Sequence, residues 1–203
     1  MNIVISKLTP DLAEDYVRFF DKTPHWYDSD KRKCYCVPYC NDDYEEIKSL
    51  VTTQEAIRKY AIQCVKGGKL QGYLAYYGDK IVGWCNANTK SDCLKCNGWR
   101  YNLSFVPTEE STTGLKAKSV FCFVIAPEMR RNSIAKLLLG RVCHDAAQDG
   151  FDFVESYPEK EFINESDGYQ GPVELYRKSG FTVFYEIDKQ LVMRKLLKQS
   201  PAV

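Results

Sequence analysis

Hydrophobic and polar residues alternate in two neighbouring stretches near the middle of the chain, residues 70–77 and 80–88. Alternation with a period of two is typical of a half-buried β-strand. The intervening Gly78-Asp79 has the composition of a tight turn, so the pattern predicts a β-hairpin. Further strands are predicted from their apolar residues at 4–6, 118–125, 151–157, 181–187 and 190–195.

Helical spacing of the apolar residues predicts four helical regions. The first has Thr9 as its N-cap and Pro10 in the first helical position, and it runs to about residue 20. The second covers residues 45–63, is interrupted near Thr52, and ends at Gly67-Gly68. The other two are residues 133–148 and a short helix around Tyr176. Residues 101–113 are polar and are predicted to form a loop.

These elements occur in the order β-α-α-β-β-β-α-β-α-β-β. This order predicts an α/β fold with a mixed central sheet and helices on both faces. At 203 residues the chain suits a single domain spanning 1–203, with an added aromatic and cysteine-rich segment at 21–43. A parallel sheet that opens between the strand ending at Ile125 and the strand beginning at Phe151 would form a cleft at the strand ends.

The chain has 28 Lys and Arg residues and 27 Asp and Glu residues. This balance argues against nucleic acid as a partner, because binding to nucleic acid needs a basic surface. We see no apolar run of membrane-spanning length and no secretory signal pattern after Met1. A cytoplasmic location is therefore expected, with no membrane partner and with the nine cysteines reduced. Oligomeric state stays open, with a homodimer among the options.

The segment after the 118–125 strand has the features of an anion site. A proline stop and a basic loop, Arg130-Arg131-Asn132-Ser133-Ile134-Ala135, lead into the 133–148 helix. The first N–H groups of a helix have no partner within the helix, and the helix dipole favours negative charge there. We therefore expect this turn to bind a phosphate or pyrophosphate.

The same segment resembles motif A of the GNAT superfamily, whose members are acetyl-CoA-dependent N-acyltransferases. The family pattern is Arg/Gln-x-x-Gly-x-Gly/Ala after a strand and a proline, and here Arg130 and Ala135 fill its ends. Ser133 replaces the first glycine, and its hydroxyl could cap the helix. A second similarity, Leu175-Tyr176-x-x-x-Gly180-Phe181, follows about 40 residues later. The resemblance covers roughly residues 70–197.

This resemblance implies an N-acetyltransferase that uses acetyl-CoA as co-substrate and acetylates a primary amine of a small molecule or peptide. Residues 130–135 would bind the pyrophosphate through backbone N–H groups. The main chain of Phe123, Val124 and Ile125 would pair with the pantetheine arm and polarise the acetyl carbonyl. Tyr176 would protonate the departing thiolate, or it could be a core aromatic residue.

The base that accepts the amine proton is less clearly indicated. Glu155 lies within the predicted 151–157 strand, beside the expected cleft. A polar residue there faces either a site or solvent, and both alternatives stay open. The acceptor is not written in the sequence either. The amino-terminal part is rich in aromatic residues and aspartates, which would either bind a cationic amine or form a folded flap with an acidic surface. They are Trp26, Tyr27, Tyr35, Tyr39 and Tyr44, and Asp28, Asp30, Asp42 and Asp43.

The cysteine clusters suggest a different class of function. Cys34, Cys36 and Cys40 form one group and Cys93-x-x-Cys96 forms another, and thiolates at such spacing can chelate zinc. Free thiols are the default interpretation, so no metal is predicted. A zinc or thiol sensor, and a CoA-binding module without catalysis, are the alternatives to the enzyme.

Overall fold

The structure of the chain is a computed structural model, and it describes residues 1–23, 33–50, 52–108, 113–161 and 167–197. Trp26, Tyr27, Asp28 and Asp30, which the sequence suggested as part of an acceptor surface, lie outside the described residues. No helix within the described ranges is long and apolar enough to cross a membrane.

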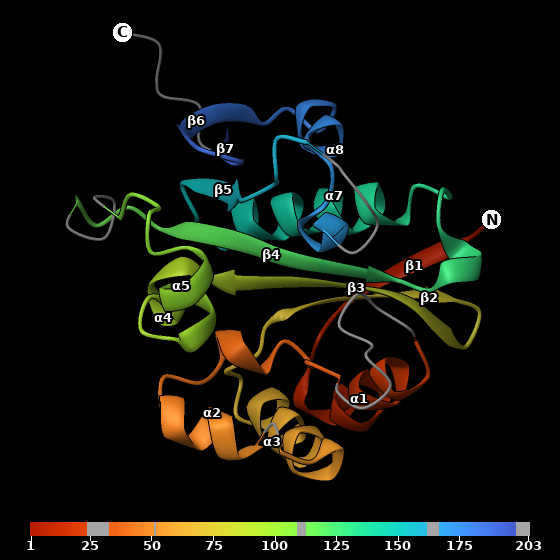
Figure 1. Cartoon of the computed structure of the whole chain (residues 1–203). Helices are drawn as coiled ribbons and strands as arrows, with labels where there is room; N and C mark the ends of the chain where they lie inside the picture. Colours follow the sequence, from red (N-terminus) through yellow and green to blue (C-terminus); the bar gives the residue numbers. More distant parts are fainter. Residues whose placement is uncertain (24–32, 51, 109–112, 162–166, 198–203) are drawn as a thin grey trace, which may run out of the picture.

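Seven strands form one mixed sheet in the order β1-β2-β3-β4-β5-β7-β6 (Figure 1). All neighbouring strands are antiparallel except β4 and β5, which are parallel. The strands are β1 (Ile3–Lys7), β2 (Gly72–Tyr77), β3 (Lys80–Thr89), β4 (Ala117–Ile125), β5 (Phe153–Ser156), β6 (Thr182–Ile187) and β7 (Gln190–Leu196). The predicted α/β class, mixed sheet and 70–88 hairpin are confirmed.

One face of the sheet is covered by amino-terminal helices, seen below the sheet in Figure 1. The single interruption predicted near Thr52 separates α2 from α3, and the Thr53 side chain caps α3 by accepting a hydrogen bond from the Ala56 N–H (3.1 Å). These helices and turns are η1 (Pro10–Leu12), α1 (Ala13–Lys22), η2 (Val37–Tyr39), α2 (Tyr44–Leu50) and α3 (Gln54–Lys66). The Thr9 side chain, in contrast, makes no cap hydrogen bond.

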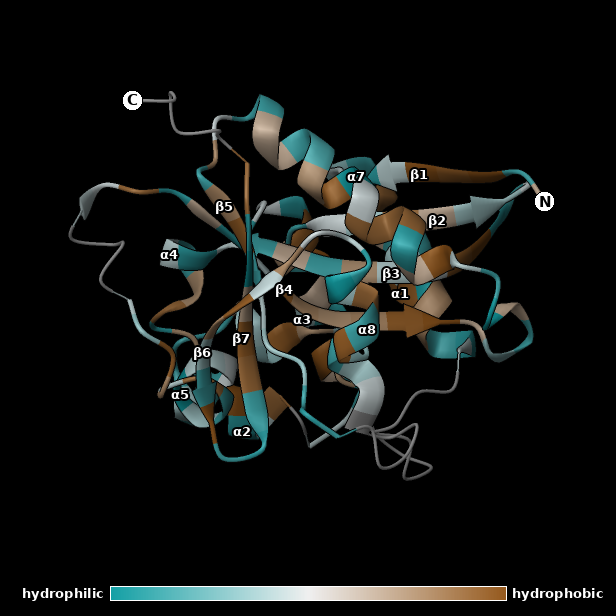
Figure 2. Ribbon diagram, turned by 90° about the horizontal axis from the view of Figure 1, so that it is seen from above, coloured by the Kyte–Doolittle hydropathy of each residue, from teal (hydrophilic) through white to brown (hydrophobic). Residues whose placement is uncertain are grey.

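The opposite face is covered by α7 (Ile134–Gln148), which Figure 2 shows crossing β1, β2 and β3. The turn η4 (Asp167–Gln170) and helix α8 (Val173–Arg177) follow β5. Each face has its own apolar core. Trp84 and Phe121 belong to the α1–α3 side, whereas Leu138 and Tyr176 belong to the α7 side.

Two short helices follow β3 and were not predicted. They are α4 (Lys90–Cys93) and α5 (Asn97–Asn102). Trp99 of α5 is buried against the sheet, and α5 overlaps the segment expected to be a polar loop only at residues 101–102. Helices this short give little periodic signal, and their stability comes from tertiary packing.

Candidate functional site

The parallel strands β4 and β5 pair over only part of β4. Pairing runs from Ala117 opposite Phe153 to Val120 opposite Ser156. Residues 121–125, which we call the distal half of β4, continue without a β5 partner. The sequence predicted a cleft between these two strands, and beyond the Val120–Ser156 pair the two strands are no longer hydrogen-bonded to each other.

A β-bulge lies at the same point. On the β3 side, Asn86 pairs with Cys122 and Ala87 pairs with Val120, so Phe121 is an extra residue on β4. A bulge bends its strand and increases the local twist. The distal half of β4 therefore changes course at the residue that follows the last β5 pair. The turn η4 packs against β4, and a Cβ on Gly171 would lie 3.3 Å from the Phe123 ring.

The distal half of β4 leads directly to the start of α7. After η3 (Pro127–Met129), residues 130–133 are exposed to solvent, while Ile134 is buried in the core. Ile134 fits there because Gly83 on β3 has no side chain, and a Cβ would lie 3.0 Å from both Ile125 and Ile134. This packing fixes the first turn of α7 beside the end of β4.

The turn before α7 is held in an unusual backbone conformation. Arg131 (φ 62°) and Ser133 (φ 60°) are both left-handed, a region that non-glycine residues enter at a cost of about 1–3 kcal/mol. The Asn132 side-chain amide donates to the carbonyls of Met129 (3.2 Å) and Arg130 (3.1 Å) and closes the turn. Ser133 thus reproduces the backbone geometry for which the family pattern has glycine.

The expectation that the Ser133 hydroxyl caps α7 is wrong, since Ser133 makes no side-chain cap hydrogen bond. A capping serine has an extended backbone that aims its oxygen at the first helical N–H groups, and the left-handed conformation does not. The N–H groups at the start of α7 are consequently left without this cap. These N–H groups, with Arg130 and Arg131 beside them, are the groups for which the sequence predicts an anion site.

Tyr176 is completely buried in α8. Its hydroxyl donates to the Gln170 carbonyl of η4 (2.5 Å), and its ring packs edge-on against Phe181 with centroids 5.3 Å apart. Burial raises the pKa of the Tyr176 hydroxyl well above its usual value, so the group stays protonated. Tyr176 therefore carries a proton close to β4 and β5, but that proton is already engaged by a backbone carbonyl.

Glu155 faces neither solvent nor an open site. Its carboxylate is fully buried and accepts from the Tyr157 hydroxyl (2.8 Å), the Lys90 ammonium (2.8 Å) and the Arg194 guanidinium (2.5 Å). Ser119 in turn bonds to Tyr157 (2.6 Å). We call these five residues the Glu155 cluster. The sequence offered solvent or a site as alternatives for Glu155, and the structure adds a third, a saturated ion-pair cluster.

Several buried polar groups that the sequence did not single out have no hydrogen-bond partner within the described residues. They include both side-chain atoms of Asn86, the Ser156 hydroxyl and the Gln170 side-chain nitrogen. Asn86 lies opposite Cys122 beside the bulge, and Ser156 ends the β4–β5 pairing. An unsatisfied buried polar group costs about 1–3 kcal/mol, so such groups indicate where a ligand or water would bind. From the sequence, Asn86 and Ser156 could have been singled out only as polar residues inside apolar strands.

The structure brings the two cysteine groups together, although they are over 50 residues apart in sequence. The Cys93 sulfur lies 3.5 Å from the Tyr39 carbonyl, and Asn97 bonds to Asn41. None of the nine cysteines, all of which lie in the described ranges, forms a disulfide. Within the described part of the chain, no group of three or more His, Cys, Asp or Glu residues could hold a metal ion.

Two of the tyrosines suggested for an acceptor surface belong to the core instead. Tyr35 is fully buried and donates to Asp21 (2.6 Å), and Tyr39 stacks on Phe121 at 4.3 Å. Tyr44 is exposed on α2. These three residues therefore do not form one aromatic surface.

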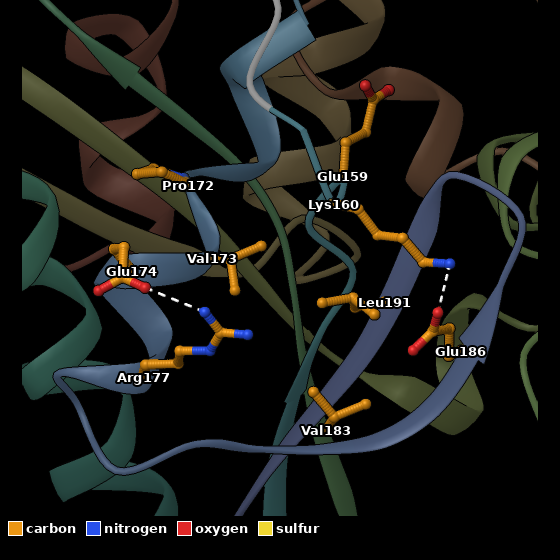
Figure 3. Close-up of a pocket in the computed structure, with 9 residues that line it drawn as sticks. All are labelled: Glu159, Lys160, Pro172, Val173, Glu174, Arg177, Val183, Glu186 and Leu191. Carbon is orange, nitrogen blue, oxygen red and sulfur yellow. Dashed lines mark hydrogen bonds and ion pairs between the residues drawn. The ribbon is translucent and has the colours of Figure 1, made fainter.

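A cavity of about 380 Å³ lies beside α8 (Figure 3). Its apolar floor includes Val173, Val183 and Leu191, and ion pairs at its rim join Lys160 to Glu186 (2.5 Å) and Arg177 to Glu174 (3.0 Å). None of the sequence-predicted site residues lines this cavity. It lies between α8 and the β6–β7 hairpin.

Comparisons with known proteins agree with this geometry. A structure of PaiA N-acetyltransferase from Thermoplasma acidophilum in complex with coenzyme A is similar over 97% of this chain and 99% of its own, with 16% identity and a TM-score of 0.54. A mosquito arylalkylamine N-acetyltransferase-like protein is similar over 96% and 100%, with 15% identity and a TM-score of 0.57. A putative acetyltransferase from Salmonella typhimurium with its cofactor acetyl-CoA is similar over 100% and 98%, with 13% identity and a TM-score of 0.52.

At these identities the similar structures establish the fold alone. A search of curated protein sequences found no match. The family described as acetyltransferase (GNAT) matches residues 10–181, which is most of the chain. The resemblance seen in the sequence is thereby confirmed: the chain belongs to the GNAT acetyltransferase family and is an acyltransferase.

Proposed function

We propose that this acyltransferase transfers the acetyl group of acetyl-CoA to the primary amine of a small molecule or peptide. The observation that carries the proposal is the continuous path from the distal half of β4 to the uncapped start of α7. A strand edge without a β5 partner suits an extended amide chain, and an uncapped helix start suits a pyrophosphate. Acetyl-CoA contains both groups, because its pantetheine arm is an extended amide chain that is joined to a pyrophosphate.

The roles of the loop and strand follow from this placement. The backbone of residues 130–135 and the Arg130 and Arg131 side chains would bind the pyrophosphate, with Ala135 leaving room at the helix start. The main chain of Phe123, Val124 and Ile125 would pair with the pantetheine arm, and an N–H there would polarise the thioester carbonyl. The relatives with bound coenzyme A or acetyl-CoA support this choice of co-substrate.

The proton transfers involve buried groups. Tyr176 would protonate the departing thiolate after its hydroxyl exchanges the Gln170 carbonyl for the sulfur. Glu155 would accept the amine proton only after one of its three donors releases it. Ser156 and Asn86 would hydrogen-bond the thioester end or a water that relays the proton.

The acceptor class stays broad. Similar structures include an arylalkylamine N-acetyltransferase-like protein and an Escherichia coli ribosomal-protein-S18-alanine N-acetyltransferase, so small and peptide amines are both candidates. We place the reaction in the cytoplasm and treat residues 1–203 as one catalytic domain.

Thermal unfolding with acetyl-CoA, combined with a thiol-release assay over a panel of amines, tests the proposal. Binding to the folded state should stabilise it by about 2.7 kcal/mol at a hundredfold excess over the dissociation constant. Free CoA thiol should then appear only with an acceptor amine. Stabilisation without turnover on both small amines and peptides would contradict the proposed reaction, and no stabilisation would contradict acetyl-CoA as the co-substrate.

A further inference from the structure

Cys93 and Cys96 lie at the two ends of the turn that joins α4 to α5. The Cys96 N–H donates to the Cys93 carbonyl (2.9 Å), so the two residues are the first and fourth of a hydrogen-bonded turn. The Cα atoms at the ends of such a turn are within about 7 Å, which is close to the reach of a disulfide. The Cys93 thiol donates to the Tyr39 carbonyl (3.5 Å), and the Cys96 thiol donates to the Asp92 carbonyl (3.7 Å).

The two thiols have different surroundings. Cys96 lines an open cavity of about 460 Å³, together with Lys69 and Lys95 and with Asp42 and Asp92. The neighbouring Cys93 lowers the pKa of the Cys96 thiol, and Lys69 acts in the same direction, while burial and Asp42 oppose them. The net shift places the pKa of the Cys96 thiol below its usual value.

Cys93 lies behind Cys96 and is fully buried. Its sulfur accepts from the Asn88 side-chain amide (3.4 Å), and its thiol lies within reach of both the Cys96 sulfur and the Tyr39 carbonyl (3.5 Å). The neighbouring Cys96 and burial raise the pKa of Cys93, so it stays a protonated thiol. Cys96 is only 6% exposed but lines the cavity wall, and the fully buried Cys93 lies behind it, which is the arrangement of an attacking and a resolving cysteine.

We propose that Cys93 and Cys96 form a redox-active dithiol that exchanges with low-molecular-weight disulfides. The Cys96 thiolate attacks one sulfur of the external disulfide, breaks its S–S bond and expels one thiolate. Cys93 then loses its proton, attacks the Cys96 sulfur and expels the second thiolate. One internal disulfide is formed and one external disulfide is reduced to two thiols, so electrons and protons balance.

The position of the pair connects it to the site. Lys90, three residues before Cys93, pairs with Glu155 on β5 (2.8 Å). Trp99, three residues after Cys96, packs edge-on against the bulge residue Phe121, with centroids 6.3 Å apart. A disulfide across the turn would thus change the segment that holds both β5 and the start of the distal half of β4. This consequence for acetyl-CoA rests on the proposed function, whereas the exchange chemistry does not.

Incubation of the full chain with glutathione disulfide tests the chemistry. The reaction is quenched in acid, free thiols are alkylated under denaturing conditions, and the protein is digested with trypsin. Cleavage after Lys90, Lys95 and Arg100 places Cys93 in peptide 91–95 and Cys96 in peptide 96–100. We expect these two peptides to be recovered joined, lighter by two hydrogen atoms than their sum, and separated by dithiothreitol.

Two variants identify the order of attack. Cys93→Ser should stop at a glutathione adduct on Cys96, because the resolving thiol is gone. Cys96→Ser should lose both the adduct and the joined peptides. Cys143→Ser, which removes a buried thiol of α7, is the control and should behave as wild type. Alkylated Cys93 and Cys96 after the incubation, or a link between other cysteines in place of theirs, would overturn the proposal.

Acetyl-CoA titration of the fully oxidised and the reduced protein tests the coupling. We expect the affinity to differ by about fivefold or more and to be restored by dithiothreitol. Equal affinities would overturn the coupling. Absence of binding in both forms would instead contradict the proposed co-substrate, while the peptide linkage measured separately would still decide the exchange chemistry.

Discussion

Two polar regions lie on opposite sides of the β4–β5 junction, and their hydrogen bonding differs. The turn from residue 130 to Ala135 is exposed, its backbone is strained at Arg131 and Ser133, and its helix start lacks a Ser133 cap. The Glu155 cluster is buried, and its carboxylate already accepts three hydrogen bonds. Groups that are left unsatisfied are available to a ligand, whereas groups that are satisfied internally hold elements together.

The largest effect on stability should come from removing the carboxylate at the centre of the Glu155 cluster. Glu155→Ala would leave Lys90 and Arg194 as buried cations without their carboxylate, which should lower the free energy of unfolding by about 3–5 kcal/mol. Urea denaturation measures this. Glu174→Ala, which removes an exposed partner of Arg177, is the control and should cost less than about 1 kcal/mol. A small loss for Glu155→Ala would mean that the cluster is not a structural brace.

A carboxylate introduced at the start of α7 should weaken acetyl-CoA binding and leave the fold unchanged. Ala135→Glu puts negative charge and bulk at the start of α7, so the dissociation constant for acetyl-CoA should rise about 100-fold or more, which is at least about 2.7 kcal/mol. Calorimetry measures this. Ala147→Glu makes the same change on the exposed last turn of α7 and should leave the affinity within a few-fold. Equal affinities for the two variants would contradict the pyrophosphate assignment.

Tyr176 combines the two properties, because its hydroxyl is already hydrogen-bonded within the protein and is also proposed to protonate the CoA thiolate. Tyr176→Phe should lower the free energy of unfolding by about 1 kcal/mol and, if the hydroxyl protonates the thiolate, turnover by about 100-fold. Tyr16→Phe is a matched control, since that buried hydroxyl also donates to a backbone carbonyl, that of Tyr35 (2.9 Å). Similar stability losses with unchanged turnover in both variants would remove Tyr176 from the catalytic residues.

The smallest effect concerns the strain at Ser133. Ser133→Gly should raise the free energy of unfolding by up to about 1 kcal/mol, because glycine adopts positive φ without strain but loses more entropy on folding. Ser133→Ala should be nearly neutral, since the hydroxyl makes no cap hydrogen bond. Thermal unfolding of both variants separates backbone strain from capping, and a clear loss in the alanine variant would mean that the hydroxyl contributes after all.

Much of the fold could be predicted because its signals are local. The Gly78-Asp79 hairpin, the break near Thr52 and the strand leading to α7 each depend on residues close together in sequence. The capping role expected for Ser133 was wrong, because sequence does not report that its backbone is left-handed. The partners of Glu155 were missed because Lys90 and Arg194 come from elements far away along the chain.

The bulge at Phe121 has a consequence for anyone redesigning β4. Val120 faces the α7 core, Phe121 and Cys122 both face the α1–α3 core, and Phe123 returns to the α7 core. Counting alternate residues across this point therefore assigns the wrong layer to every later position. A mutagenesis library written in register from Ala117 would assign Cys122 and the residues after it to the opposite core, whereas one written with a phase shift of one residue after Phe121 would not.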